Sequence, residues 1–355
     1  MARIHIPSLV HRDVISRWEP CAYTGKILHQ CEMLSSLGHE VFLYSGPECD
    51  ARVKEHIPVV SEDDRQEWFG DETWEQTVFY DFDANAPHWK TFNGRTIEAI
   101  RERIEPGDLI GLTMGYTHFA LQQAFPNHVT AEIGIGYEGI IDNTHHCFES
   151  YAWMHTMYAK KGINDGRFFD VVIPNAFDPA DLLFKEEKEG YLLFMARMID
   201  RKGLGVATEL AKRFPVITAG QGDARIPGAE HVGVVRGSAK AELLAGASAL
   251  LSPTIFVGPF EGVSVEAMMS GTPAITTDFG CYAETVLDGV SGARCHTLTE
   301  FIAAAEKALN GGFDPMAVRD WAMGRYTLEA VAPQYDRWLG RLETLYAGGW
   351  YEGAI

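Results

Sequence analysis

The sequence predicts an α/β protein made of two doubly wound domains, each a parallel sheet covered by helices. Three observations support this fold class. The chain has 355 residues, about twice the length of a typical domain. Short apolar strands alternate with helical segments along most of it. A charged stretch at 184–190 interrupts this alternation, which restarts directly after it, as expected for a solvated linker.

The first half begins with a βαβ unit. A helix opens at Gly25 and presents Ile27, Cys31 and Leu34 on one face. Strands expected at 3–10 and 40–44 flank this helix, and units of this kind have parallel strands. Residues 46–92 show no clean periodicity. The later expected elements of this half are a helix at 96–104 and strands at 108–113, 128–134 and 170–175.

The second half repeats the same alternation. Its strands are expected at 191–195, 215–220, 249–252 and 273–277, and its helices at 205–214, 240–247 and 263–270. An apolar stripe at helical spacing follows near the C-terminus, formed by Val331, Tyr335, Trp338, Leu342 and Leu345. We therefore expect domains at 1–174 and 191–325, an interdomain linker at 175–190, and a last helical segment at 326–355.

Composition excludes several classes of protein. With 30 Lys and Arg against 49 Asp and Glu, the net charge is −19, and no basic run favours a nucleic-acid groove. No apolar run is long enough for a membrane span, and the first residues lack the apolar core of a signal peptide, so a cytoplasmic protein is expected. The six cysteines show no metal-ligand spacing, which predicts reduced thiols and no metal site.

Three segments of the second half point to a binding site. They lie at 196–203, 218–223 and 258–273, and each follows an expected strand. Ligands of doubly wound sheets bind at the carboxyl ends of the strands, so the site is expected there, in a cleft between facing domains. The glycine-rich turn before the 263–270 helix would attract phosphate to the helix N-terminus. None of the glycine patterns is a P-loop.

Charged side chains in these segments suit a nucleoside diphosphate. Arg197 and Lys202 could neutralise the two phosphates, Arg197 as a planar fork and Lys202 as a point charge. Glu266 lies about one turn into the expected helix, where its carboxylate can accept hydrogen bonds from ribose hydroxyls. The residues alone therefore predict binding of a nucleoside diphosphate at this edge of the sheet.

These motifs resemble the retaining GT-B glycosyltransferases of family four, the glycosyl transferases group 1, including phage and bacterial members. The likeness extends over nearly the whole chain. Its motifs in this sequence are Glu266-Ala-Met with Gly271-Thr-Pro273, Arg197 with Lys202-Gly203, Gly25 before a helix ending in Gly38-His-Glu-Val41, Pro174-Asn175 with Asp178, and the stretch Glu132 to Gly139.

The resemblance implies a retaining, metal-independent hexosyltransferase that moves a sugar from a nucleotide diphosphate sugar, most plausibly a UDP-sugar, to an acceptor hydroxyl. It implies no cofactor beyond this donor, and a last helix that crosses back to the N-terminal, acceptor-side domain. Arg197 and Lys202 would stabilise the departing diphosphate. The donor-binding residues would be Gly25, Gly220, Gly258, Pro259, Phe260, Glu261, Gly262, Val263 and Glu266.

The sequence departs from the family pattern at two places. Gly258 stands where the first glutamate of the donor signature is expected, and Glu261 stands where glycine is usual. The histidine expected after the strand at 128–134 is also missing, and His118 and Glu132 are the candidates to replace it as catalytic residues. These departures bear on the donor sugar more than on the fold.

Two alternatives stay open on the sequence. One is a glycosyltransferase that acts on modified bases of phage DNA. The other is a GT-B-like binding or scaffolding protein that has lost turnover through the changes at Gly258 and Gly134. The sequence does not identify the acceptor, which could be a glycan, a small molecule or DNA, and it gives no oligomeric state.

Overall fold

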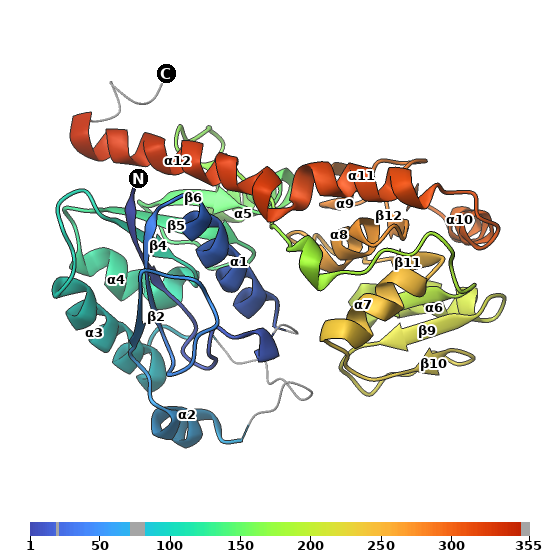
Figure 1. Ribbon diagram of the computed structural model, residues 1–355, viewed down its shortest axis with the longest axis horizontal. Helices are drawn as coiled ribbons and strands as arrows, with labels where there is room; N and C mark the ends of the chain where they lie inside the picture. The colour runs from blue at the N-terminus through green and yellow to red at the C-terminus, as the bar shows by residue number, and fades with distance from the viewer. Residues whose placement is uncertain (19–20, 72–81, 349–355) are drawn as a thin grey trace. The chain divides into compact units, whose positions relative to one another are not determined.

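The computed structural model describes residues 1–18, 21–71 and 82–348, and it divides into two compact units (Figure 1). Unit 1 contains residues 1–149, residues 157–176 and the C-terminal stretch that begins at Val331. Unit 2 contains residues 150–156 and 177–330. Neither unit is a single continuous segment of the chain.

Unit 1 is built on one parallel sheet, as the βαβ pattern predicts. Its strand order is β3-β2-β1-β4-β5-β6-β7, so the order reverses direction between β1 and β4. The strands are β1 (Arg3–Pro7), β2 (Glu40–Ser45), β3 (Glu55–Pro58), β4 (Leu109–Leu112), β5 (Val129–Ile135), β6 (His145–Phe148) and β7 (Val171–Val172).

Two helices of unit 1 begin at a recognisable start signal in the sequence. Ser61 and Asp64 form a capping box at the start of α2, and Pro87 occupies the first turn of α3. The helix expected to open at Gly25 begins three residues earlier, at Ala22. These helices are α1 (Ala22–Ser36), α2 (Glu62–Phe69), α3 (Pro87–Arg101), α4 (Phe119–Ala124) and α5 (Tyr151–Lys161), of which α5 starts in unit 2.

Unit 2 repeats this architecture with a second parallel sheet. Its strand order is β10-β9-β8-β11-β12-β13, and the reversal falls between β8 and β11. The strands are β8 (Leu192–Met195), β9 (Val216–Ala219), β10 (Glu230–His231), β11 (Ala249–Ser252), β12 (Ala274–Thr277) and β13 (Gly292–Cys295). The predicted α/β class with two doubly wound sheets is therefore confirmed.

The core of unit 2 lies where helices cover its sheet. Phe194, Leu251 and Ile275 come from the strands, and Met268 comes from α8; all four are buried in one apolar cluster. The helices are α6 (Leu204–Ala211), α7 (Gly237–Gly246), α8 (Gly262–Met269), α9 (Tyr282–Thr285), α10 (Leu298–Leu309) and α11 (Pro315–Tyr326).

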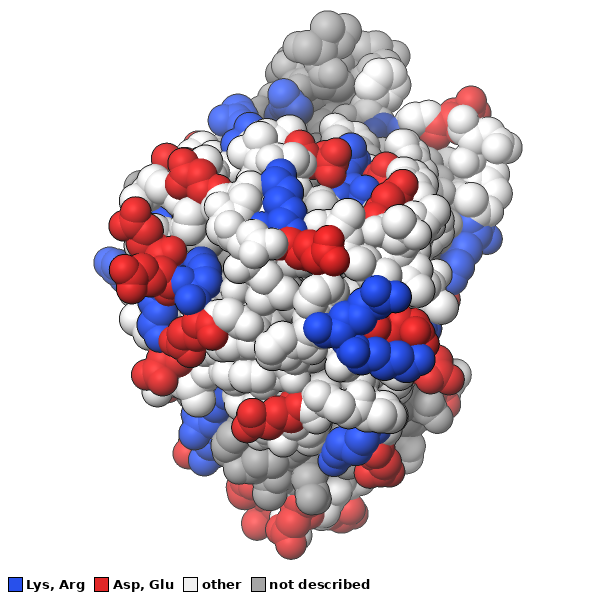
Figure 2. Space-filling view, turned by 90° about the vertical axis from the view of Figure 1, so that its right-hand side faces the viewer, with Lys and Arg blue, Asp and Glu red and all other residues white. Residues whose placement is uncertain are grey.

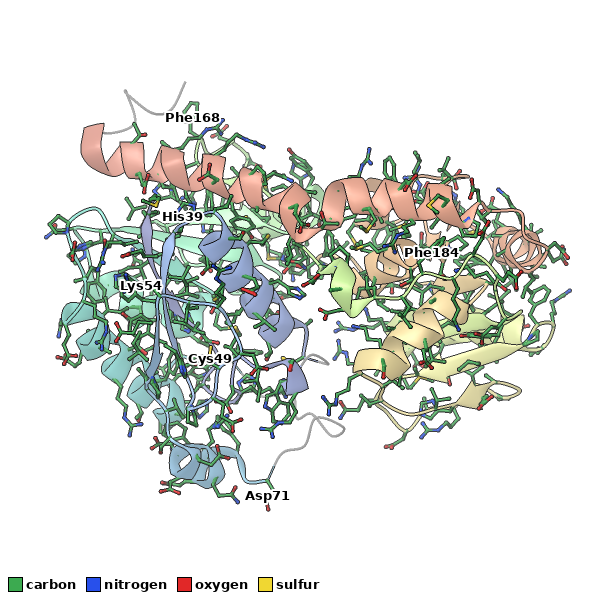
Figure 3. All side chains as sticks on the ribbon, viewed as in Figure 1. His39, Cys49, Lys54, Asp71, Phe168 and Phe184 are labelled. Atoms are coloured by element: carbon green, nitrogen blue, oxygen red, sulfur yellow. The ribbon has the colours of Figure 1, made fainter. Side chains whose placement is uncertain are left out.

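The charged stretch at 184–190, expected as a solvated linker, is only partly solvated. Glu186, Glu187 and Glu189 are exposed, whereas Phe184 and Lys188 pack on unit 2. The ring of Phe184, labelled in Figure 3, lies 2.6 Å from where a Cβ of Gly271 would be. Lys188 Nζ donates to Ala245 O at 2.9 Å and to Thr272 Oγ1 at 3.0 Å. Burial lowers the pKa of Lys188 to about 8. The charge of Lys188 therefore does not predict exposure to solvent, because its amino group donates to carbonyl and hydroxyl oxygens of unit 2.

The last helix, α12 (Leu328–Gly348), is red in Figure 1 and buries its apolar stripe within unit 1 from Val331 onward. Tyr335 OH accepts from Gln30 of α1 at 3.2 Å, and Trp338 Nε1 donates to Phe169 O at 2.8 Å. The predicted stripe is buried at Val331, Tyr335, Trp338 and Leu342, and Leu345 is partly exposed.

In the part of the chain that the structure describes, no helix is long and apolar enough to cross a membrane. None of the six cysteines, all of which lie in that part, forms a disulfide. On the face shown in Figure 2, Lys and Arg side chains alternate with Asp and Glu side chains. The negative net charge is therefore not gathered into one patch on this face.

Candidate functional site

Two loops of unit 2 meet at the carboxyl ends of β8 and β11, where the strand order reverses. The first contains a short 3₁₀ turn, Asp200–Lys202, and the second runs from Pro253 into α8. The backbone N–H of Ile255 donates to Arg201 O at 3.0 Å and holds the two loops together. Doubly wound sheets bind their ligands at this place, so the fold itself marks the candidate site.

Lys202 and Glu261 join these loops through a buried ion pair. Lys202 Nζ lies 2.6 Å from each carboxylate oxygen, and the two side chains are 12% and 8% exposed. Glu261 has left-handed backbone angles, φ 57° and ψ 57°. Its carboxylate folds back over Gly258, where a Cβ would collide with it. The glycine at 258 therefore leaves the space that the carboxylate of Glu261 occupies.

The amino end of α8 lies beside this pair. Glu261 is the N-cap residue of α8. Its side chain makes no capping hydrogen bond to any described residue, because its carboxylate accepts from Lys202 instead. Ser264 instead donates its N–H and its hydroxyl to Glu261 O, at 3.0 and 2.8 Å. The helix dipole adds positive potential here, which favours an anion.

Glu266, the expected ribose-binding residue, lies one turn into α8. Lys240 of α7 donates to its carboxylate at 2.6 Å, and the two side chains are about equally buried. Sequence reasoning did not identify Lys240, because nothing in the local pattern of α7 connects it to a residue 26 positions later.

The turn between Gly258 and Gly262 is held in place by contacts with the interior of unit 2. Phe260 is 3% exposed, and its ring stacks on Phe177 and meets Tyr326 edge-on. The side chain of Phe260, one of the expected donor-binding residues, therefore lies in the core of unit 2. Pro259 O accepts the hydroxyl proton of Ser150 at 2.6 Å, so this residue also fixes the loop.

Glu284 of α9 holds the segment that carries Ser150. Its two carboxylate oxygens accept the backbone N–H groups of Tyr151 and Ala152, both at 2.8 Å. Ser150 Oγ also accepts from Trp153 N at 3.1 Å. Ser150 was not identified as a site residue, since a contact across more than 100 positions leaves no local signal.

The remaining expected donor residues differ in their surroundings. Gly220 follows β9 with φ 139°, and a Cβ there would collide with the carbonyl of Ala196. Gly262 lies 2.9 Å, measured from its would-be Cβ, from the ring of Phe177. Val263 and Arg197 are half-buried in unit 2, in α8 and in the loop after β8.

Gly25 belongs to unit 1 and lies inside α1 rather than in a loop before it. Outside its own turn, no described atom lies within 4 Å of where its Cβ would be. The structure therefore shows no steric need for glycine at this position.

His118 and Glu132, the candidates for the missing histidine, are both 0% exposed. His118 lies between Trp89 and Phe92, with ring centroids at 5.5 and 5.8 Å. Burial lowers its pKa to about 3, so the imidazole is neutral. Neither side chain can contact a substrate in this conformation, and the hypothesis of a catalytic role for them is not supported.

Glu132 is instead part of a buried polar network in unit 1. Its carboxylate accepts from Tyr137 OH and from Ile141 N, both at 2.8 Å, and lies 3.2 Å from His146 Nε2. His146 Nδ1 lies 3.0 Å from Asp170. Burial lowers the pKa of His146, but hydrogen bonds to Asp170 and Glu132 outweigh it and raise the pKa to about 9. The imidazole is therefore a cation between two carboxylates.

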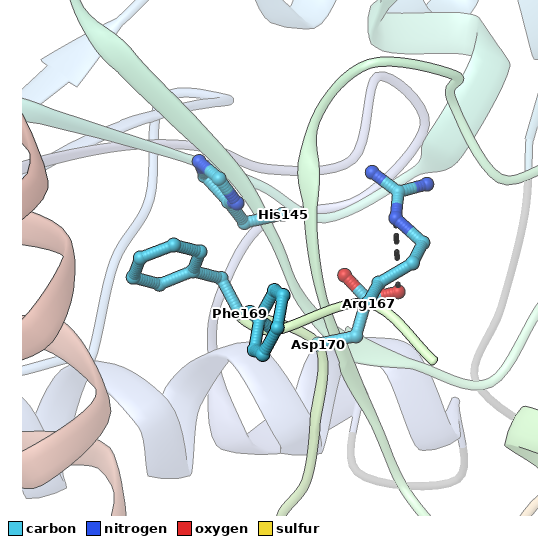
Figure 4. Close-up of a pocket in the computed structure, with 5 residues that line it drawn as sticks. His145, Arg167, Phe169 and Asp170 are labelled. Carbon is cyan, nitrogen blue, oxygen red and sulfur yellow. Dashed lines mark ion pairs between the residues drawn. The ribbon is translucent and has the colours of Figure 1, made fainter. Parts of the chain in front are cut away.

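Unit 1 also contains a pocket at the amino ends of β6 and β7 (Figure 4). It has a volume of about 200 Å³ and is lined by His145 and the segment 167–170, where Arg167 Nε pairs with Asp170 at 3.6 Å. A neighbouring pocket of about 210 Å³ shares His145. Both lie at the opposite end of the strands from the carboxyl edge and contain no expected donor residue.

The described residues include no group of three or more His, Cys, Asp or Glu side chains placed to hold a metal ion. Charged side chains at the candidate site include Arg197, Lys202 and Lys240, and Glu261 and Glu266.

Residues 189–311 match the family model described as Glycosyl transferases group 1, and all donor residues expected in unit 2 fall within this range. No curated protein matches the chain.

Solved structures match over nearly the whole chain. AviGT4, a glycosyltransferase involved in avilamycin A biosynthesis, is 21% identical, with a TM-score of 0.67, over 97% of this chain and 98% of its own. Sucrose-phosphate synthase from Thermosynechococcus elongatus is 16% identical, with a TM-score of 0.67, over 96% and 99%. Anabaena HepE in complex with UDP and glucose is 14% identical, with a TM-score of 0.66, over 96% and 100%. The chain therefore has the GT-B fold of these proteins.

Proposed function

We propose that the protein is a retaining glycosyltransferase that moves a sugar from a nucleotide diphosphate sugar, a UDP-sugar, to an acceptor hydroxyl. The observation that carries this proposal is the Lys202–Glu261 pair beside the amino end of α8, at the carboxyl ends of β8 and β11. The group 1 family match over residues 189–311 supports it, and so does the UDP complex of HepE, which shares the fold.

In this proposal the protein supplies the positive charge of the reaction. Lys202, Arg197 and the N-terminus of α8 bind the diphosphate, and Glu266 accepts hydrogen bonds from the ribose. The bond between the sugar C1 and the diphosphate oxygen breaks. The acceptor oxygen then bonds to C1 from the face that the leaving group vacates, and its proton passes to the diphosphate. No metal and no further cofactor are required.

The test replaces the two cations one at a time. Lys202→Ala and Arg197→Ala should each cost about 2–4 kcal/mol of transition-state stabilisation, because one charge on the departing diphosphate is lost. Release of UDP from a panel of UDP-sugars measures this. Lys212→Ala is the matched control, since this lysine pairs with Glu209 on an exposed helix face. A rate within twofold of wild type in either site variant would refute the assignment.

The alternative of an inactive binding protein makes a different prediction in the same experiment. Such a protein would gain thermal stability with a UDP-sugar but would release no UDP, with or without added acceptors. The DNA-modifying alternative would instead show retention on duplex DNA that falls steeply with salt.

A further inference from the structure

The amino group of Lys202 has an anionic partner within the protein. Glu261 reaches it with both carboxylate oxygens at 2.6 Å, in a pair that is almost wholly buried. The proposed function requires the same amino group to bind the donor diphosphate. Two anions therefore compete for one buried cation, and the diphosphate has to displace or rearrange the carboxylate.

We propose that Glu261 is a specificity-determining residue, which makes the site select a nucleotide sugar over a free nucleoside diphosphate. This inference rests on the proposed function of the site. A buried carboxylate that loses its cation is strongly destabilised unless new hydrogen bonds replace the lost pair. The hydroxyls of a donor sugar supply such hydrogen bonds, whereas a nucleoside diphosphate without the sugar supplies none.

Neighbouring residues hold the backbone of the turn at Glu261 in place, so that only its side chain has to move. Glu261 has φ 57°, a left-handed conformation that is unfavourable for a non-glycine residue. The fold maintains this conformation through the buried ring of Phe260, the hydrogen bond from Ser150 to Pro259 O, and the two bonds from Ser264. Exchange of partners therefore takes place by rotation of the Glu261 side chain.

Gly258 is the second half of this arrangement. The carboxylate of Glu261 lies where a Cβ of residue 258 would be, so a side chain at 258 would force the Glu261 side chain to shift. With glycine at 258 and glutamate at 261, the carboxylate can pair with Lys202 and can leave it when the diphosphate binds there.

The same contact acts at the end of the reaction. Once the sugar has been transferred, Glu261 loses its hydroxyl partners while the nucleoside diphosphate is still bound to the amino group of Lys202. Return of the carboxylate to Lys202 then favours departure of the product.

Glu261→Gln tests the inference, because it keeps the shape of the side chain and removes its charge. Titration calorimetry gives the Kd of UDP and of UDP-glucose for each chain. We expect UDP to bind the variant on the order of tenfold more tightly, while UDP-glucose gains less, since its sugar loses a charged acceptor. The ratio of the two Kd values, UDP to UDP-glucose, therefore falls. A merely structural role would weaken both ligands together.

Three further variants make the result specific. Glu209→Gln changes the net charge equally on an exposed face of α6, and should leave both Kd values unchanged. Glu261→Gly suits the left-handed backbone and should tighten UDP binding even if the glutamine variant folds poorly. In the Lys202→Ala background, Glu261→Gln should no longer tighten UDP binding, because the shared cation is gone.

Equal or weaker UDP binding by both Glu261 variants, with a wild type that binds UDP, would overturn this inference and leave the proposed function standing. A wild type that binds neither UDP nor UDP-glucose would overturn the proposed function, and the inference with it.

Discussion

Individual carboxylates in this chain take their roles from partners that lie far away in the sequence. Glu132 and Glu261 both stand in glycine-containing stretches and both were expected at the site. Glu132 is enclosed by Tyr137 and His146, whereas Glu261 pairs with Lys202 at the carboxyl edge of the sheet. The spacing of the second-half motifs predicted Lys202 and Glu261. It could not separate Glu132 from them, because burial depends on the assembled sheet.

The buried network around His146 makes a prediction for pH. The pKa of His146 is raised from 6.5 to about 9 in the folded chain, so its charge stabilises the fold fully below about pH 6.5, and this stabilisation is lost as the pH rises through 9. The loss should be on the order of 3 kcal/mol in the free energy of unfolding of unit 1. Denaturant unfolding at pH 6 and pH 9.5 measures it.

His146→Gln is the comparison for this measurement, because glutamine does not titrate. The variant should be less stable than wild type. Its free energy of unfolding should also fall less between pH 6 and pH 9.5, because the titration of His146 is absent. An identical slope in both chains would show that His146 is not the titrating group.

Among the helices and strands, those with a strong apolar period or a clear end signal were predictable. The stripe that starts at Val331 and the glycine-rich turn before α8 are examples. β6 was missed because His145-His146-Cys147-Phe148 has no apolar alternation, and its inward histidine is paired with carboxylates instead. α2 was missed because it is short and polar, although the capping box of Ser61 and Asp64 marks its start.

Trp338 tests how much α12 contributes to unit 1. It is 2% exposed and donates to Phe169 O at 2.8 Å, so Trp338→Ala should leave a cavity and an unpaired carbonyl. We expect a loss of about 3–5 kcal/mol in the free energy of unfolding of unit 1. Arg337→Ala, the exposed neighbour, is the control and should change stability little. Equal effects of the two substitutions in denaturant unfolding would contradict this role of the stripe.

For the whole molecule, an excess of acidic residues has to be reconciled with an anionic ligand. The chain carries 49 acidic and 30 basic side chains, yet the proposed donor site gathers Arg197, Lys202 and the amino end of α8 at one edge of one sheet. Local charge, rather than net charge, governs binding at such short range because salt screens distant charges beyond about 8 Å.

If these groups neutralise the diphosphate, a chelator should leave the transfer rate nearly unchanged. The measurement is UDP release from a UDP-sugar with excess EDTA, compared with added magnesium or manganese. Activity that disappears in EDTA and returns with either metal would mean that a cation, rather than Lys202 and Arg197, carries the charge.

The division of unit 1 among three stretches of chain has a consequence for synthesis in the cell. The stripe from Val331 to Leu342 fills part of the interior of unit 1, and it is translated after all of unit 2. Domains of most proteins finish folding in the order of their synthesis, the N-terminal one first. Here the half that was translated first cannot complete its interior until the last helix has been made, so we expect unit 1 to finish folding after unit 2.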